Sequence, residues 1–371
     1  MSKIFELYGY RLDSWTEKAS ENCSKAWCPF MDAECDGGGN RYSSALNLTA
    51  NPRLATKFPG KATVQSGVCS LAIKEGEQPW IVCPRRLLTL KQKVASTPDY
   101  QTKVKSELRK HITDTTTQLR VWSEVKMKIG MNSGDSQDKV FDYTFDYIIS
   151  GQQRILLNDV AKIIAKSESQ TRKIAEQNGY TLAMRNSEVW IDDFPSDPIC
   201  IVEIMTSSTS GGDKKKRTQI SMACEDAILD PSNHNGPGIN YRQVWARMVS
   251  QLIVKSQVGI AWNGMTFWLI QDVLADYISN STALDLSTFL SDVTDEVNIL
   301  SFGYGDAIKE TSKESIVELN EALLYSGPID SREQSPENHG GFVDIIKIGS
   351  PPPKANLWRS LFLKQSCGSF P

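Results

Sequence analysis

Two acidic residues at the ends of apolar segments carry the chemistry that this sequence predicts first. Residues 197–205, DPICIVEIM, indicate a buried strand whose apolar side chains leave no polar face until Glu203. Residues 140–150, VFDYTFDYIIS, predict a second strand with Asp142 and Asp146 on one face, because side chains repeat every two residues. Magnesium-dependent cleavage of a phosphodiester needs two acidic groups that hold the cation. Asp146 and Glu203 fit these two roles.

The residue two places after Glu203 is Met205, where the group that activates the attacking water should stand. Residue 205 shares a strand face with Glu203, but a thioether neither accepts a proton near neutral pH nor ligates magnesium well. The peptide carbonyl of Ile204 would add a hard oxygen ligand. We therefore expect Lys214, Lys215, a second bound water or the substrate phosphate to orient the water. Met205→Gln or Met205→Lys should then retain or raise activity.

Three further aspartates compete with Asp146 for the metal-ligand role. These aspartates are Asp142, Asp192 and Asp193, and the strand pattern does not rank Asp146 above them.

Five of the eight cysteines fall within residues 23–83, a segment rich in glycine and turn-forming residues. Tetrahedral metal sites take four thiolates or imidazoles, usually from two tight turns, and all-sulfur ligation suits zinc or iron. Cys28 and Cys35 come from one loop, and Cys69 and Cys83 from the ends of an expected hairpin. Cys23 is an alternative ligand in the first loop, and free buried cysteines are the alternative to a metal site.

Two segments carry polar side chains suited to DNA. The first is the basic run Lys214, Lys215, Lys216 and Arg217, which would bind phosphates. The second is residues 156–182, which predict two helices around a polar break. Gln170, Arg172 and Lys173 would lie on its second helix, where they could meet bases or phosphates. The alternatives are a solvated loop and an amphipathic helix pair inserted in an enzyme.

The elements that must position these residues indicate an α/β protein. Residues 1–95 predict a loop-rich module, and a helix is expected after Pro98. Residues 241–259 predict an amphipathic helix. Thr311 and Glu314 form a capping box that predicts another helix over 315–323. We expect a module at 1–95, a main domain at 96–350 with a helical insertion at about 150–198, and a tail at 351–371.

Composition limits the class of protein. The 371 residues carry a formal net charge of -3, so contact with phosphates must come from local patches. No stretch reaches the roughly 18 apolar residues of a membrane span. The first residues lack the pattern of a secretory signal. We expect a cytoplasmic protein.

Several segments, in order, resemble restriction endonucleases of the NotI and EagI type. The resemblance spans about residues 20–275, and its cysteine motifs are the most specific part. The segments are the CPF…C loop at 28–35, GVCS at 67–70, VCPRRLL at 82–88, TFDYII at 144–149, VEI at 202–204 and GPGINYRQVWARMVSQLI at 236–253.

The resemblance implies a bacterial or archaeal Type II restriction endonuclease with a PD-(D/E)XK nuclease core. Such an enzyme acts as a homodimer on a short palindrome of double-stranded DNA, beside a cognate DNA methyltransferase. Asp146 and Glu203 become the Mg²⁺ ligands. Four cysteines become the ligands of a structural iron, with zinc as the substitute; they are Cys28, Cys35, Cys69 and Cys83.

The sequence departs from that family at the catalytic motif. The family has Glu-x-Gln where this chain has Met205, and its two acids are closer in sequence, so 150–198 is an insertion. The family also has a further acid upstream, for which Asp135, Asp138 and Glu124 are candidates. An alternative is a catalytically inactive, sequence-specific DNA-binding protein on the same scaffold. A third interpretation is a metal-containing regulator that reads DNA with residues 156–182.

Overall fold

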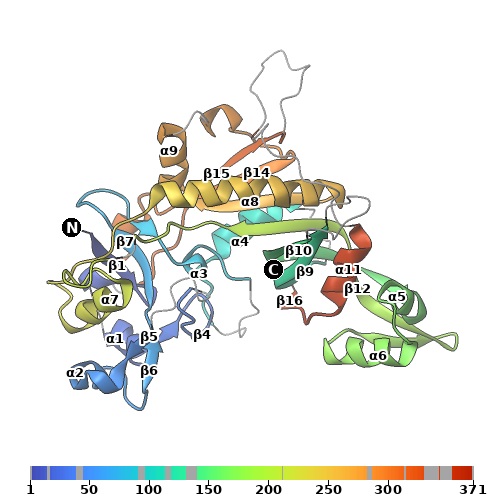
Figure 1. Cartoon of the computed structure of the whole chain (residues 1–371), viewed down its shortest axis with the longest axis horizontal. Coiled ribbons are helices and arrows are strands. Elements are labelled where there is room, and N and C mark those ends of the chain that lie inside the picture. Colours follow the sequence, from blue (N-terminus) through green and yellow to red (C-terminus); the bar gives the residue numbers. More distant parts are fainter. Residues whose placement is uncertain are drawn as a thin grey trace.

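A large mixed β-sheet forms the centre of the protein, as a computed structural model shows (Figure 1). The structure describes residues 2–14, 17–38, 45–90, 97–112, 118–130, 140–210, 212–281, 286–312, 315–329, 342 and 353–369. In these ranges the sheet has eight strands, with β12, β13 and β14 parallel and the remaining pairs antiparallel. In spatial order they are β15 (Glu321–Gly327), β14 (Val297–Gly303), β13 (Met265–Gln271), β12 (Glu188–Ile204), β10 (Val140–Leu156), β9 (Arg120–Gly130) and β16 (Gly368–Ser369), with β11 (Leu182–Arg185) paired to β12.

Helices cover both faces of this sheet, which confirms the α/β class. Alternate residues of β12 point to opposite sides. Ile199 and Ile201 pack with α8 (Tyr241–Ala261), whereas Cys200 and Val202 pack with α4 (Thr102–Ile112). The α8 face also holds α9 (Asp272–Ser281). The apolar stripe predicted for the helix over 241–259 therefore packs on the sheet, and the helix predicted after Pro98 packs on the other face.

The N-terminal residues form a lobe of short elements. Its sheet runs β2-β1-β7-β8. The core of the lobe also includes Ala223 and Cys224 from α7 (Ile220–Leu229), so this part of the fold draws on a distant segment. The remaining bounds are β1 (Lys3–Leu7), β2 (Tyr10–Arg11), α1 (Glu17–Ser24), β3 (Trp27–Cys28), β4 (Ala33–Glu34), β5 (Ala45–Asn47), α2 (Pro52–Ala55), β6 (Thr63–Gln65), β7 (Val68–Ala72), β8 (Trp80–Ile81), α3 (Pro84–Leu87) and 3-10 turns at Leu12–Ser14 and Leu48–Ala50.

Strands β10 and β12 continue beyond the central sheet into an arm. The two predicted helices are present as α5 (Leu157–Ile163) and α6 (Glu168–Gln177). The expected helical insertion is only partly helical, because residues on both sides of the pair extend the two long strands. An apolar cluster containing Val160, Phe194 and Phe362 joins the arm to α11 (Lys354–Phe362) of the tail.

The prediction of a helix over 315–323 is wrong. Residues 316–320 have no regular structure, and β15 begins at Glu321 as the edge strand beside β14. Ile316 and Val317 are buried in two different apolar clusters. Tertiary burial of an extended segment outweighs the local capping signal. The other elements here are a 3-10 turn at Leu286–Phe289 and α10 (Ala307–Glu310).

Figure 1 shows the N-terminal lobe and the arm hanging on opposite sides of the central sheet and α8. The middle of the sheet, where β10 meets β12, lies between them. In the ranges given above, no helix has the length and hydropathy needed to cross a membrane.

Candidate active site

Asp146 and Glu203 meet where strands β10 and β12 separate. The antiparallel pairing of the two strands ends at Tyr147 and Val202, and the two acids are the next residues. The N–H of Asp146 donates to Glu203 Oε1 at 3.2 Å. The N–H of Ile204 donates to Asp146 Oδ2 at 2.9 Å. Each carboxylate therefore accepts a backbone hydrogen bond from the other strand, which fixes both acids at the fork.

Lys255 of α8 joins these acids from the helical layer. Its Nζ lies 2.5 Å from Glu203 Oε2 and donates to the carbonyl oxygen of Thr144 at 2.8 Å. Lys255 and Glu203 are 3% and 2% exposed, so the pair is inaccessible to bulk water. A buried ammonium is stable only when it is paired and hydrogen-bonded. The sequence interpretation missed this residue.

A signal for Lys255 was present in the helix. Val244, Met248 and Leu252 form the stripe of α8 that packs on the sheet. Lys255 follows at helical spacing on the same stripe. A lysine on the apolar face of a buried helix needs an acidic partner, and the same sheet face carries Glu203.

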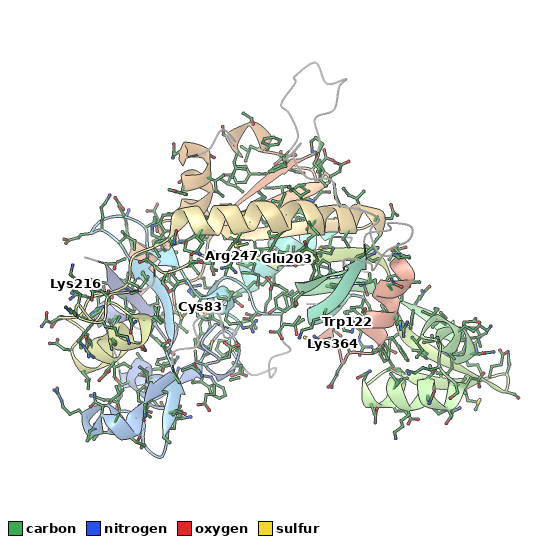
Figure 2. The ribbon with its side chains drawn as sticks, viewed as in Figure 1. Cys83, Trp122, Glu203, Lys216, Arg247 and Lys364 are labelled. Atoms are coloured by element: carbon green, nitrogen blue, oxygen red, sulfur yellow. The ribbon has the colours of Figure 1, made fainter. Side chains whose placement is uncertain are left out.

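Met205 lies in the apolar layer beside α8. Its side chain is 8% exposed and packs in an apolar cluster with Trp268 and Met248. The face of Met205 was predicted correctly, since both 203 and 205 point toward α8. Figure 2 places Lys216, which directly follows the two lysines proposed to orient the water, at the outer edge of the N-terminal lobe and away from Glu203.

The surroundings of Glu203 favour a nearby cation. The pKa of Glu203 is raised to about 8, because burial and then the charge of Asp146 raise it more than Lys255 and the N–H of Asp146 lower it. Desolvation disfavours the ionised carboxylate unless positive charge compensates. The donor set of Asp146, Glu203 and the Ile204 carbonyl consists of hard oxygens, which suits magnesium.

A cavity of about 150 Å³ adjoins the fork. Asp146, Ile204 and Glu124 line it together with Arg85; Gly38, Pro84, Thr144 and Tyr147 complete the lining. Of the candidate upstream acids, Glu124 therefore lies beside Asp146. Asp135 and Asp138 fall outside the described residues.

The side-chain alternation of β9 and β10 changes phase at Glu124 and Asp146. Trp122 and Val125, three residues apart, point into one cluster, as do Phe145 and Ile148. In a regular strand, residues an odd number apart point to opposite faces. Glu124 absorbs the change with a φ of 52°, and the Lys364 ammonium donates to its carbonyl oxygen at 2.7 Å. This irregularity turns both acids toward the cavity.

Two of the competing aspartates belong to the arm. Asp193 pairs with Arg120 at 2.6 Å, and Asp192 pairs with Arg154 at 2.7 Å. Neither lines the cavity beside the fork. The side chain of Asp142 lies outside the described residues.

The four predicted cysteine ligands gather in one part of the N-terminal lobe. Cys28, Cys69 and Cys83 belong to one buried cluster, and Cys35 packs against it. Burial, and then the neighbouring Cys28, raise the pKa of Cys83 to about 12, while the N–H groups of Arg86 and Arg85 lower it. Cys23 lies in a different cluster with Cys224.

The sulfurs do not form a closed cage. In the part of the chain that the structure describes, no group of three or more His, Cys, Asp or Glu side chains is positioned to hold a metal ion. The four cysteine sulfurs still suit a soft or borderline cation. Such a cation would stabilise their thiolate forms, which otherwise repel one another.

The predicted DNA-contacting residues have separate environments. Lys214, Lys215 and Lys216 are exposed, but Arg217 is bound to Asp226 at 2.8 Å and to Glu225 at 3.2 Å. Gln170 caps its own helix, because its side chain accepts the N–H of Ser167. Arg172 and Lys173 are exposed on α6.

The chain matches no protein-family model and no curated protein. The geometry of the site therefore carries the functional conclusion.

Proposed function

We propose that the protein is a magnesium-dependent endonuclease of the PD-(D/E)XK class that hydrolyses double-stranded DNA. The observation that supports this most strongly is the arrangement of Asp146, Glu203 and Lys255 at a strand fork. Two acids and one ammonium are the groups that metal-assisted phosphodiester hydrolysis requires. The lysine comes from α8 instead of from the strand that carries Glu203.

Asp146, Glu203 and the carbonyl of Ile204 would hold magnesium. When bound, magnesium supplies a Lewis acid and lowers the pKa of a coordinated water. Lys255 favours the ionised form of Glu203 and orients its carboxylate through its 2.5 Å contact. The ammonium of Lys255 donates to Glu203 and to the Thr144 carbonyl, so its proposed role is to position Glu203 beside the cation. Glu124, on the cavity wall, is the proposed further acid.

The shape of the molecule supports a DNA substrate. Glu203 lies between the N-terminal lobe and the arm (Figure 2), and we propose that a duplex bound at the fork contacts both. Exposed Arg172 and Lys173 of the arm would contact phosphates and add a salt-dependent share of the affinity. We propose further that the enzyme acts as a homodimer on a short palindrome, as a Type II restriction endonuclease of the NotI and EagI type, in the cytoplasm beside a cognate methyltransferase.

The cysteine cluster is proposed as the structural metal site. Cys28, Cys35, Cys69 and Cys83 would hold iron or zinc and so stabilise a lobe built from short strands and turns.

The alternative of a non-cleaving DNA-binding protein rested on Met205. Lys255 supplies the charged group that this alternative assumed to be missing. We therefore favour the enzyme.

Cleavage of plasmid DNA tests the proposal. The wild type should cut a plasmid into discrete bands with magnesium, and Asp146→Asn, Glu203→Gln and Lys255→Met should each lose about 100-fold or more of the rate. Lys105→Met is the matched control, because Lys105 is also buried, at 6% exposure, but pairs with Asp99 beside α4. Undiminished cutting by Lys255→Met, or equal losses in Lys105→Met, would contradict the assignment.

A further inference from the structure

Arg85 lines the cavity beside the fork together with Asp146 and Glu124. It follows Cys83 and Pro84 at the start of α3, in the N-terminal lobe. The cavity is therefore lined by two carboxylates of the central sheet and by a guanidinium of the cysteine-bearing lobe. Its 150 Å³ would admit a phosphate group.

The side chain of Arg85 is held at one end. Its Nε donates to Asp36 Oδ2 at 3.0 Å, and Asp36 is in turn fixed by the N–H of Gly38 at 2.9 Å. Nη2 lies 3.7 Å from Glu124 Oε1, which is an ionic contact beyond hydrogen-bond length. The Arg85 side chain is 13% exposed. Among the described residues, Asp36 accepts a hydrogen bond from Nε of this guanidinium. The Arg85 side chain also lines the cavity.

The next residue in the chain shows how a purely structural arginine is held here. Arg86 is fully buried and bonds to both carboxylate oxygens of Glu6. It also donates to the carbonyl of Val317 and lies over the ring of Tyr304. Arg85 is less buried than Arg86 and is held by Asp36 alone at hydrogen-bond distance among the described residues, so its guanidinium is less fully engaged than that of Arg86.

We propose that Arg85 binds the non-bridging oxygens of a DNA phosphate in this cavity. The guanidinium presents N–H donors in a planar fork that matches phosphate bidentately. Two nearby carboxylates, Asp146 and Glu124, would repel a phosphate unless positive charge faced them. This inference deepens the proposed nuclease function and rests on it.

Both residues of the Arg85–Asp36 pair lie within two positions of a cysteine in the sequence. Asp36 follows Cys35, and the backbone N–H of Arg85 points to the sulfur of Cys83. The fold of the cysteine cluster therefore positions the guanidinium, which links a structural module to the chemistry at the fork.

Binding of a small phosphodiester tests Arg85 without any need for cleavage. Dimethyl phosphate is titrated into the full chain in the presence of calcium, and the side-chain Nε–Hε resonances of the arginines are followed. The Arg85 resonance should shift saturably, and the shifts of Gly38 and Ile204 amides should vanish in Arg85→Met. Arg11→Met is the control, since Arg11 is 12% exposed and paired with Asp13, away from the cavity. An Arg85 resonance that stays fixed, or amide shifts that survive in Arg85→Met, would overturn the inference.

Cleavage assays then separate this inference from the proposed function. Arg85→Ala should cut DNA about 100-fold more slowly than the wild type, and added ethylguanidinium should restore part of the rate. A merely structural role would give no such rescue, and its absence in a folded variant would count against Arg85. If the wild type does not cut DNA while dimethyl phosphate still shifts Arg85, the nuclease proposal fails and the phosphate site stands.

Discussion

At the scale of single residues, the charged group next to Glu203 comes from a different element than its motif predicts. A catalytic ammonium has to reach the acid in space, and the sheet face that carries Glu203 is covered by α8. Lys255 therefore brings an ammonium to Glu203 from the helical layer instead of from position 205. Met205 packs with Trp268 and Met248 in the apolar layer.

This packing reverses the expectation for substitutions at Met205. Met205→Lys would place an unpaired ammonium in an apolar cluster, so it should lower the free energy of unfolding by about 3 kcal/mol. Met205→Leu keeps volume and polarity and should cost less than about 1.5 kcal/mol. Urea denaturation of both variants measures the difference. Equal stabilities, with cutting enhanced in Met205→Lys, would restore position 205 as the site of the water-activating group.

At the scale of elements, the sequence predicted which segments are helix or strand better than how they meet. The strands that carry Asp146 and Glu203, the helix pair at 156–182 and the helix over 241–259 are all present, because their periodicity reflects burial on one face. The phase change at Glu124 and Asp146 leaves no mark in the sequence. It arises from pairing between strands, which local propensity does not encode. The helix expected over 315–323 failed for a related reason, since burial of Ile316 and Val317 favoured an extended chain.

Strand β1 depends on a histidine from another segment. His234 Nε2 accepts the N–H of Ile4 at 2.8 Å, and its Nδ1 faces the carbonyl of Pro231 at 3.0 Å. These contacts require the neutral ring, with the proton on Nδ1. Burial lowers the pKa of His234 from its usual 6.5, and nearby Lys3 lowers it further, while Asp226 and Asp230 oppose this.

The pH dependence of stability follows from that shift. A histidine with a lowered folded pKa binds fewer protons when folded than when unfolded, so its contribution is present above pH 6.5 and is lost as pH falls through the folded pKa. His234→Gln should therefore show a smaller loss of unfolding free energy than the wild type between about pH 7 and pH 5. Urea titrations at several pH values measure both slopes. Identical slopes would mean that His234 is protonated without cost in the folded chain.

At the scale of the whole molecule, the N-terminal lobe and the central sheet are joined by a buried polar network. Glu6 of β1 pairs with Arg86 of α3 at 3.0 Å and accepts a hydrogen bond from Tyr304, which follows β14. Ser70 of β7 bonds to the same carboxylate at 2.8 Å. These four residues lie far apart in the sequence and have no shared motif, so their meeting could not be predicted. The network fixes the lobe, and with it Arg85, against the fork.

The cysteine cluster lies within this fixed lobe, and metal binding there should stabilise the whole molecule. Cys69→Ala should lose the bound iron or zinc and lower the melting temperature, because metal affinity contributes directly to folding free energy in a small module. Cys23→Ala is the matched control: Cys23 is equally buried but lies in the cluster with Cys224. It should keep its metal and lose only about 1 kcal/mol for the removed sulfur. Elemental analysis and thermal melts of both purified variants decide the point. Equal metal content in the two proteins would remove Cys69 from the ligand set. No metal in the wild type would leave the four cysteines as buried packing residues, and the lobe would then depend on its polar network and apolar core alone.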